Sequence, residues 1–513
     1  MKRANKKSVI KYIMILLLAA ILCVAAIFAL WWYGAFLPKW VEWKTHTTSY
    51  YGLDLELKDR KLVLTDDRNE LWSSKKDWFV QDLLISDINN DGEEELVLLV
   101  WKHSSFGKHR PVWVKRNDIN LQQHVFIYKY DKSREEKLRA IWMSSATIYE
   151  IDSIERCFYN KLLVNDRAGN SKVWYWQDFG LKVGPEYEGD ELSIVSVGDN
   201  LIHSWMLKYS DSEDFDYVNG SYDGFYCHIK DRVTSADIAT VNQETPLIND
   251  NSLLGDYPRF GSPSGIAKAL SNAGFDVASC ATNHMFDRGA KGALYTATML
   301  ADNGIKSVGI NLDGDISNNC VFINTNGIRV AFLSYTYGTN GIPNPEDNLY
   351  LIETFKDEER LRRQIQYARL RADAVIVFAH WGTEYESEPD EEQYRLANLF
   401  REENVDVVIG NHPHVIQKME QYEEDNHTTT VFYSLGNFVS GQDRPERLVG
   451  GLASYNIIKD SKGKILISNP EMEEIVMHQS KEECAVYLLS DYTEELASQH
   501  KVKELKEHIY SKK

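Results

Sequence analysis

The feature that most constrains this fold is a set of five apolar runs, each of which stops at residues able to bind a metal ion. The run at 407–409 is followed by GNHPH at 410–414, so His412 and His414 come directly after a predicted buried strand. The ligands of α/β sheets bind at the carboxyl ends of the strands, where such side chains meet. If only one strand ended in this way, two surface histidines would be the alternative interpretation. Five strands that each end in a residue able to bind a metal favour a shared metal centre. The other four runs end at Asp199, Glu244, Asn283 with His284, and His380.

The second half of the chain alternates predicted strands with predicted helices. Apolar residues at helical spacing indicate helices at 262–270, 290–303, 358–368 and 391–400. Short apolar runs indicate strands at 374–378 and 405–409. This succession predicts an α/β domain over residues 191–480. The Asn-Gly pair at 326–327 predicts a hairpin, which makes the sheet system mixed. The polar segment 491–513 predicts a solvated C-terminal helix.

The N-terminus combines positive charge with a long apolar run. Five cationic residues among the first eleven precede an uncharged segment at 12–37, which is long enough for a helix to cross a bilayer of about 30 Å. A cleavable signal peptide is the alternative, but its apolar region is usually about 7–15 residues long and ends in small residues. We therefore expect an uncleaved, single-pass anchor in the cell membrane. The excess of positive charge predicts that residues 1–11 are cytoplasmic and that the main domains are extracellular.

Residues 45–188 have the pattern of a β-rich domain. Short alternating or aromatic runs are separated by clusters of Asn, Asp, Gly and Lys, and no long segment has helical spacing. A small antiparallel barrel or sandwich is expected. The runs lie at 62–64, 96–101, 124–128 and 173–176.

One loop of this domain has the spacing of a calcium site. Asp87, Asn89, Asp91 and Glu95 occupy positions 1, 3, 5 and 9 of the loop, and Gly92 stands where a sharp turn is needed. The loop resembles the DxNxDG loops of FG-GAP and VCBS-type β repeats, although a single copy does not support a propeller. A bound calcium ion is the prediction, and an acidic turn without an ion is the alternative.

The overall charge limits the classes of molecule that the protein can bind. With 76 acidic and 57 basic residues, the chain has a formal net charge of −19, which opposes binding to nucleic acid. An acidic chain is compatible with a membrane-facing or cell-wall role. Six cysteines without metal-type spacing indicate neither a disulfide framework nor a site for a softer metal.

The residues at the strand ends define the chemistry of the predicted centre. Two carboxylates, one amide oxygen and up to four imidazoles suit Zn²⁺, Mn²⁺ or Fe²⁺ better than Ca²⁺. Two such ions that share a bridging carboxylate activate a water molecule to attack a phosphoryl or acyl group. The set is also compatible with a single ion. Metal-dependent hydrolysis is therefore the predicted chemistry.

With these motifs, the chain from about 191 to 440 resembles the CapA family of capsule synthesis proteins (PGA_cap domain, poly-γ-glutamate synthesis). That family is a branch of the calcineurin-like metallophosphatase superfamily. The resemblance implies a four-layer α/β/β/α metallophosphatase-like sandwich, preceded here by the transmembrane helix and the β-rich domain. It rests on the segments 197–199, 242–247, 281–289, 380–384, 410–415 and 433–438.

The resemblance also implies a role for each site residue. His284 matches the superfamily histidine that contacts the phosphate and protonates the leaving group. Glu244 takes the place of a bridging aspartate. The other implied ligands are Asp199 and His414 for one ion and Asn283, His380 and His412 for the second.

The sequence departs from the superfamily pattern next to Asp199. Leu201 stands where a metal-binding histidine is expected, so one ion loses a ligand. His203 is the nearest replacement, although a loop histidine that faces solvent is the more ordinary interpretation. A mononuclear site, or one with weak hydrolytic power, is compatible with this loss.

Several neighbours of the ligands have weaker assignments. Asp287 and Arg288 are predicted to hold a phosphate or an acidic substrate, and the alternative is a pair that caps the following helix. Trp381 and Glu384 follow the predicted ligand His380, and we expect them to contact and support it. For Trp381, packing in the core is an equal alternative. The turn at 436–438 is predicted to be structural, holding the last strand against the site.

These observations lead to two hypotheses of function. In the first, the protein is a membrane-anchored, metal-dependent hydrolase that serves synthesis, export or anchoring of an anionic capsular polymer, poly-γ-glutamate. In the second, it is a non-catalytic assembly subunit that binds the polymer or its synthase. In both, the expected partners are the membrane, the polymer and the capsule synthase or other membrane subunits, and not nucleic acid.

Overall fold

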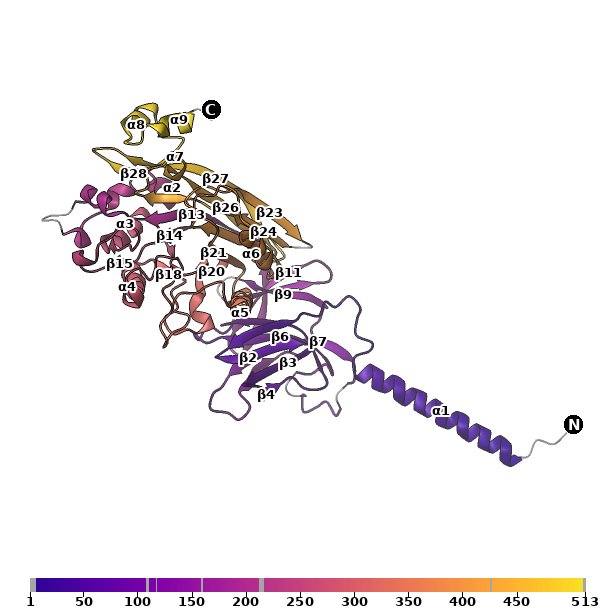
Figure 1. Cartoon of the computed structure of the whole chain (residues 1–513). Coiled ribbons are helices and arrows are strands. Elements are labelled where there is room, and N and C mark those ends of the chain that lie inside the picture. Colours follow the sequence, from indigo (N-terminus) through magenta and orange to yellow (C-terminus); the bar gives the residue numbers. More distant parts are fainter. Residues whose placement is uncertain are drawn as a thin grey trace. The chain divides into compact units, whose positions relative to one another are not determined.

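The computed structural model describes residues 6–107, 110–116, 118–157, 160–211, 216–424 and 427–510. The chain divides into two compact units (Figure 1). Unit one comprises Met1–Arg156 and Asn160–Tyr187, and unit two comprises Cys157–Tyr159 and Glu188–Lys513.

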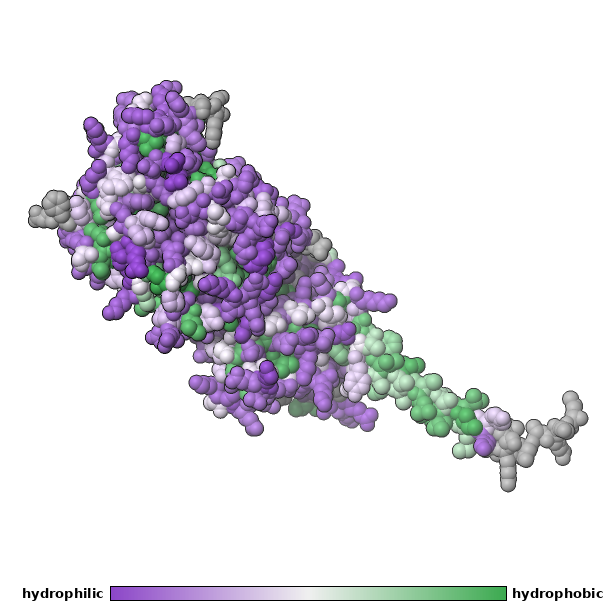
Figure 2. Space-filling view, viewed as in Figure 1, coloured by the Kyte–Doolittle hydropathy of each residue, from purple (hydrophilic) through white to green (hydrophobic). Residues whose placement is uncertain are grey.

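Unit one begins with helix α1 (Lys6–Trp32). Within it, Lys11–Trp32 is long and apolar enough to cross a membrane, and none of this segment is buried in the protein (Figure 2). The helix ends five residues before the apolar run does, because Gly34 adopts a left-handed conformation (φ 79°) that terminates the helix. The N–H of Ala35 then donates to the carbonyl of Leu30 (2.9 Å). The helix therefore covers the predicted span at 12–37 as far as Trp32, and the last five residues of that span follow the helix.

The rest of unit one is β-rich, as expected, and two of its sheets pack their apolar side chains into one shared core, as in the predicted sandwich. Within the described residues, consecutive strands pair into three four-stranded sheets. Tight turns keep the pairing local: Asp59–Arg60 and Asp67–Arg68 both have positive φ, as two-residue hairpin turns require. The first sheet contains β1 (His46–Tyr50), β2 (Leu53–Lys58), β3 (Lys61–Asp66) and β4 (Asn69–Ser73). The second contains β5 (Trp78–Ser86), β6 (Glu95–His103), β7 (Leu121–Tyr130) and β8 (Leu138–Met143), and the third β9 (Ile151–Cys157), β10 (Lys161–Asp166), β11 (Ser171–Gln177) and β12 (Gly180–Glu186).

The first large sheet of unit two has the order β18-β17-β14-β13-β26-β27-β28, with β25 also paired to β13. The strands from β13 to β18 in this order are parallel, so their carboxyl ends share one edge. Strands β26 to β28 add antiparallel pairs on the other side of β13. The bounds are β13 (Asp190–Leu201), β14 (Ile238–Gln243), β17 (Val277–Ser279), β18 (Lys306–Val308), β25 (Asn437–Ser440), β26 (Val449–Lys459), β27 (Ile465–Gln479) and β28 (Cys484–Leu488).

The second large sheet has the order β19-β20-β21-β22-β24-β23. Its central strands are parallel, and both edge strands are antiparallel to their neighbours. The predicted Asn-Gly hairpin is confirmed, because β19 and β20 pair around Asn326 and Gly327, which both have positive φ. The bounds are β19 (Val321–Thr325), β20 (Ile328–Thr336), β21 (Ala374–His380), β22 (Val407–Asn411), β23 (Met419–Glu424) and β24 (His427–Phe432).

The two large sheets pack face to face between outer helices. Along β21, Ile376 and Phe378 lie in the core between the sheets, whereas Val375 and Val377 face the helices, which explains why this strand is apolar at every position. Helices α3 (Gly265–Ala273) and α4 (Gly289–Asp302) cover the first sheet, and α5 (Glu358–Arg369) and α6 (Glu391–Glu402) cover the second. The predicted four-layer α/β/β/α sandwich is confirmed.

The C-terminal segment differs from its prediction. Instead of one solvated helix, it forms α8 (Glu494–Gln499) and α9 (Glu504–Tyr510). Leu505 is fully buried and Ile509 is 6% exposed, and both pack into the core outside the first sheet. The prediction was wrong because a short amphipathic segment with many charges has the composition of a solvated helix, and only its tertiary contacts show the buried side.

Candidate metal centre

The predicted ligands meet at the carboxyl edges of the two sheets. Asp199 lies near the end of β13, Glu244 follows β14, His380 ends β21, and His412 and His414 follow β22. Each of these five side chains is at most 3% exposed. The sequence therefore identified residues that the fold brings together from four separate strands.

The carboxylate of Glu244 stands at the centre of the cluster. Its Oε1 lies 3.7 Å from Nε2 of His414 and 3.9 Å from Nε2 of His380. The His380 Nε2 also lies 2.9 Å from Oδ1 of Asn283. The potential ligand atoms of Glu244, His412 and His414 all lie within 4.8 Å of one another. One carboxylate and two imidazoles at this spacing match the three protein ligands of many transition-metal sites.

The hydrogen bonding of the cluster is incomplete without a cation. Both carboxylate oxygens of Glu244, Nδ1 of His380 and Nδ1 of His412 are buried and have no hydrogen-bond partner among the described residues. A buried ionised carboxylate without a partner costs several kcal/mol, so native proteins pair such groups or bind metal with them. The donor set and its unsatisfied atoms therefore fit a divalent transition metal ion.

Asp199 contacts its neighbours in a different way from Glu244. Its Oδ2 lies 2.9 Å from Nδ1 of His414, and its Oδ1 accepts a hydrogen bond from Asn242 (2.8 Å). Nδ1 of His414 is also 3.1 Å from Oδ1 of Asn437. Because Nδ1 faces these acceptors, it carries the proton, and Nε2 is the nitrogen that faces Glu244. A carboxylate behind a histidine is the usual orienting partner of a metal-binding imidazole.

The three histidines of the cluster differ in the direction in which their surroundings shift their pKa values. Burial, together with the neighbouring histidines, lowers the pKa of His412 to about 3 and holds the pKa of His380 well below its ordinary value. Burial also opposes charge on His414, but Glu244 and Asp199 together raise its pKa to about 9. Burial and the charge of Asp199 raise the pKa of Glu244 well above its usual range. Neutral His380 and His412 are in the form that binds metals.

The loop after β22 holds its histidines in an unusual backbone conformation. His412 and His414 have φ angles of 98° and 60°, which non-glycine residues rarely adopt. Such strained positions cluster at functional sites, where the surrounding structure enforces them. Tyr337 packs against the ring of His412, with ring centroids 4.7 Å apart. The loop thus aims both imidazoles inward.

His284 forms a second pair beside the cluster. Its Nδ1 lies 2.7 Å from Oδ2 of Asp287, and the same oxygen accepts the N–H of Phe260 (2.7 Å). Phe260 also packs edge-on against the His284 ring, with centroids 4.8 Å apart. Asn340 lies 3.3 Å from the amide of Asn283 and 3.4 Å from His284, so it connects this pair with the ligand cluster. Asp287 therefore orients His284 and does not cap the following helix.

The guanidinium of Arg288 donates to carbonyl oxygens of the chain. Its Nε and Nη2 donate to the carbonyls of Leu253 and Arg259 (2.7 and 3.0 Å), and Nη1 donates to the carbonyl of Asp287 (3.2 Å). These bonds hold the loop that leads to Phe260. These contacts give Arg288 a structural role, and its contact with a phosphate or an acidic substrate stays a prediction.

Two of the weaker predictions near the centre concern His203 and Trp381, and both residues make structural contacts. His203 is only partly exposed: its ring packs against Phe260 (centroids 5.2 Å apart), and its Nδ1 accepts the N–H of Gly441 (3.0 Å). It therefore makes a structural contact and does not replace the missing ligand. Trp381 is 1% exposed, and its Nε1 donates to the carbonyl of Tyr433 (2.9 Å), so packing is its role.

The turn at 436–438 is structural, but it also reaches the site. The carbonyl of Gly436 accepts the N–H of Asp199 (2.9 Å), and a Cβ on Gly198 would lie 1.9 Å from that carbonyl oxygen. Only glycine at 198 allows this approach of β13 and the turn. Sequence reasoning missed Asn437, Asn242, Tyr337 and Asn340 as neighbours of the ligands. Asn242 and Asn437 lie inside motifs that the sequence did single out, whereas Tyr337 and Asn340 carry no motif.

The predicted calcium loop in unit one is organised around a lysine. The ammonium of Lys129 lies 2.5 Å from Asp91, 2.9 Å from Glu93 and 3.7 Å from Glu95. Asp87 accepts the N–H groups of Asp91 and Gly92 (2.9 Å each). Asn89 donates to Glu95 (3.2 Å). An internal cation therefore neutralises the carboxylates, and calcium binding stays a prediction.

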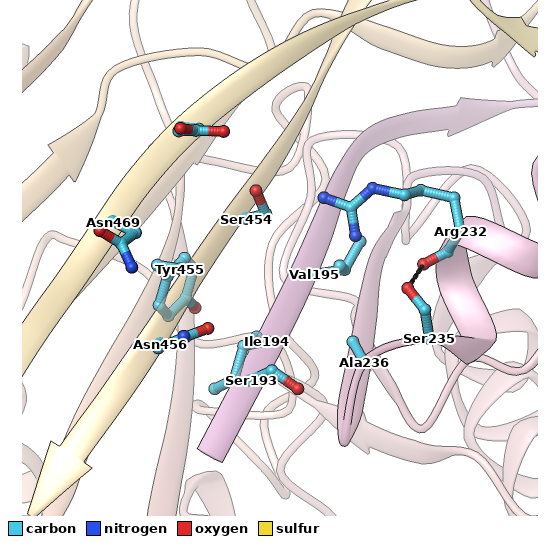
Figure 3. Close-up of a pocket in the computed structure, with 11 residues that line it drawn as sticks. Ser193, Ile194, Val195, Arg232, Ser235, Ala236, Ser454, Tyr455, Asn456 and Asn469 are labelled. Carbon is cyan, nitrogen blue, oxygen red and sulfur yellow. Dashed lines mark hydrogen bonds between the residues drawn. The ribbon is translucent and has the colours of Figure 1, made fainter. Parts of the chain in front are cut away.

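A separate cavity of about 290 Å³ lies at the other end of β13, near Ser193 (Figure 3). Arg232 lines it, but its guanidinium is paired with Glu473 (Nε to Oε1, 2.8 Å). Ser235 donates to the carbonyl of Arg232, and Ser193 donates to Asp237 (2.7 Å each). Because it is lined by residues from the amino-terminal half of β13 and by none of the predicted ligands, this cavity is not part of the metal centre.

Residues 193–442 match the family model described as bacterial capsule synthesis protein PGA_cap. The capsule biosynthesis protein CapA of Bacillus anthracis is 28% identical over 288 residues, which are 53% of this chain and 65% of that protein. The PGA biosynthesis protein CapA of Bacillus subtilis (strain 168) is 26% identical over 292 residues, which are 56% of this chain and 73% of that protein. The chain thus spans about two thirds of the length of these relatives.

Among solved structures, the NAD nucleotidase of Haemophilus influenzae is similar at 12% identity, covering 63% of this chain and 67% of that chain with a TM-score of 0.32. A score this low does not support a conclusion about function. The fold assignment rests instead on the sheet order and the four layers.

Proposed function

We propose that the chain, of which residues 193–442 match the PGA_cap model of bacterial capsule synthesis proteins, is a member of that family and a membrane-anchored hydrolase serving synthesis, export or anchoring of an anionic capsular polymer. The proposed polymer is poly-γ-glutamate, since the Bacillus subtilis relative is described as a PGA biosynthesis protein. Its partners are then the polymer, the membrane and the subunits of a capsule synthase.

The observation that carries the catalytic part is the buried carboxylate of Glu244, which has no hydrogen-bond partner among the described residues and faces imidazoles on two sides. A divalent transition metal held by Glu244, His412 and His414, with His380 and Asn283 beside them, supplies Lewis acidity for hydrolysis of a phosphoester or amide. Zn²⁺, Mn²⁺ and Fe²⁺ all suit these donors.

The other residues of the site transfer a proton or orient a histidine. Asp287 accepts from Nδ1 of His284, which leaves Nε2 as the nitrogen that exchanges a proton with a substrate. A histidine held in one tautomer in this way can protonate a leaving group. Asp199 fixes the orientation of His414. The surrounding burial excludes bulk water from the donor atoms.

Purified full-length protein, prepared without chelators, tests this function directly. We expect between one and two equivalents of a transition metal and hydrolysis of model phosphoesters or of the polymer. A protein that holds metal and hydrolyses neither would overturn the hydrolase proposal.

The second candidate is a non-catalytic assembly subunit that binds the polymer or its synthase. The presence of Leu201 in place of a ligand and the engagement of Asp199 in hydrogen bonds favour it, since both reduce the ligands of a second ion. Capsule display in cells that express His284→Ala separates the candidates: normal display supports the assembly role, and lost display supports hydrolysis.

The anchor is proposed from α1, with the N-terminus in the cytoplasm and both units outside. A protease added to intact cells is expected to digest everything beyond about residue 40 while sparing the helix. Recovery of a soluble form that starts after the apolar run would instead show a cleaved signal.

A further inference from the structure

A loop of unit one carries exposed apolar side chains at its tip. It joins β6 to β7, and at its tip the N–H of Val114 donates to the carbonyl of Pro111 (2.9 Å), which closes a turn. Val112 is 96% exposed and Trp113 is 80% exposed. A tryptophan and a valine side by side in water leave a large apolar area hydrated, which indicates a surface that is covered in the working protein.

The same loop is cationic in a strongly acidic chain. Arg110, Lys115 and Arg116 are exposed on either side of the tip, and residues 110–116 contain no acidic side chain. The next acidic residue, Asp118, is turned toward the base of the loop, where its carboxylate accepts the N–H groups of Ser105 and Asn120 (2.9 and 3.1 Å). The tip therefore presents positive charge in a chain whose net charge is −19.

One histidine joins the base of this loop to the membrane-spanning candidate α1. Nε2 of His103 lies 3.2 Å from the carbonyl oxygen of Trp32, the last residue of α1, and Nδ1 lies 3.0 Å from the carbonyl oxygen of Ile119. The His103 ring also stacks on the ring of Trp32, with centroids 4.5 Å apart and planes 7° apart. The base of the loop therefore lies against the carboxyl end of α1.

Further bonds fix the base while the tip projects from it. The N–H of Ser104 donates to the carbonyl of Asn120, and that of Ala146 donates to the carbonyl of Ser105 (2.9 Å each). Val112 is eight residues from Ser104, and a chain spans at most about 3.6 Å per residue, so the tip stays within about 30 Å of Ser104, the neighbour of the histidine that contacts the end of α1. That distance is comparable with the thickness of one bilayer.

We propose that residues 110–116 are a membrane-contacting loop, in which Val112 and Trp113 enter the headgroup region at the carboxyl end of α1 and Arg110, Lys115 and Arg116 contact anionic lipid headgroups. Tryptophan prefers this region because its ring is apolar and its N–H is polar. Each cation near an anionic surface strengthens binding roughly fivefold. The inference rests on the proposed anchor, because the helix brings the loop to the bilayer; Figure 2 shows the apolar surface of that helix.

A polarity-sensitive fluorophore attached to single cysteines tests the proposal in full-length protein reconstituted into vesicles with anionic lipid. The exposed natural cysteines are Cys23, in α1, and Cys227. Three samples are compared: Cys227→Ser, which leaves Cys23 for labelling, and Cys23→Ser with Cys227→Ser combined with either Trp113→Cys or Phe179→Cys. Phe179 is a matched control, since it is 90% exposed in the same unit but follows Asp178 and has no cluster of cations.

The expected result is that lipids carrying a headgroup-level quencher quench the label at 113 at least twice as strongly as the label at 179, and that an aqueous quencher shows the reverse order. Equal quenching at 113 and 179, with the Cys23 label protected by lipid, overturns the loop proposal and leaves the anchor intact. A Cys23 label exposed to the aqueous quencher overturns the anchor instead.

A charge variant distinguishes the membrane from an anionic polymer as the occupant. Replacing Arg110, Lys115 and Arg116 by glutamine in the Trp113→Cys background is expected to reduce lipid quenching on anionic vesicles toward its value on neutral ones. If polyglutamate, and not the bilayer, protects the label at 113 from the aqueous quencher, the loop binds polymer and the membrane proposal is wrong.

Discussion

Nδ1 of His414 lies 2.9 Å from Oδ2 of Asp199, although 215 positions separate the two residues in the chain. This contact pairs Asp199 with a histidine, whereas neither carboxylate oxygen of Glu244 has a hydrogen-bond partner among the described residues. The two buried carboxylates of the centre therefore have different roles, and substitution can separate them.

The first prediction compares the two carboxylates. Glu244→Gln is expected to abolish metal binding, because it removes the one carboxylate whose oxygens have no other described partner. Asp199→Asn is expected to keep the metal stoichiometry but to weaken affinity by roughly 10- to 100-fold, as loss of an orienting partner does. Elemental analysis and metal titration measure both. Equal loss of metal in the two variants would show that Asp199 is itself a ligand.

The second prediction concerns His284 and Asp287. His284→Asn should retain the metal and slow hydrolysis by roughly 10²- to 10⁴-fold if His284 is the general acid. Asp287→Asn should cause a smaller loss and shift the pH profile of kcat, because the carboxylate that orients Nδ1 is replaced by an amide. Phosphoester turnover at saturating metal gives both values. Wild-type turnover in His284→Asn contradicts the assignment.

The third prediction is a pH dependence of the C-terminal segment. His500 is buried, its Nδ1 accepts the N–H of Val502 (2.9 Å), and its Nε2 lies 3.2 Å from the carbonyl oxygen of Met477. Burial lowers its pKa from 6.5 to about 4. A depressed pKa contributes stability that is present above pH 6.5 and is lost as pH falls toward 4, because the unfolded chain binds the proton first.

Hydrogen exchange of residues 494–510 and the melting temperature measure this effect. His500→Asn is the control, since it keeps a side-chain acceptor and removes the titration. His478, whose ring centroid is 5.6 Å away, and the neighbouring Lys501 remain in both proteins. Wild type should lose more protection than the variant between pH 6.5 and 4. Parallel curves for the two proteins would contradict the prediction.

The fourth prediction concerns the loop around Lys129. Lys129→Met should lower the melting temperature of unit one, since Asp91, Glu93 and Glu95 then face one another without a cation. If the loop binds calcium, millimolar calcium raises the melting temperature and restores much of the loss in the variant, because the ion binds only the folded loop. Calorimetry with and without chelator decides. No response in either protein leaves Lys129 as the cation of the loop.

Much of the fold and of the centre was predictable because the relevant patterns are local. Five apolar runs, each ending in residues able to bind a metal, predicted the strands and the residues that gather at their carboxyl edges. The Asn-Gly pair at 326–327 specified a hairpin, since few residues accept its positive φ angles. The uncharged run after residue 11 likewise predicted the helix, although Gly34 ends it earlier than the run does.

Tertiary structure alone decided how individual polar side chains are used. Asp199 and Glu244 are both predicted metal ligands, and they differ because Asn242 and Nδ1 of His414 form hydrogen bonds with Asp199 and not with Glu244. Arg288 was predicted to hold a phosphate or an acidic substrate, and only the structure shows that its guanidinium donates to carbonyl groups of a loop distant in sequence. Periodicity determines which residues form strands and helices, since it depends on neighbours along the chain. The direction of a hydrogen bond depends on groups that folding brings together, so no local pattern contains it.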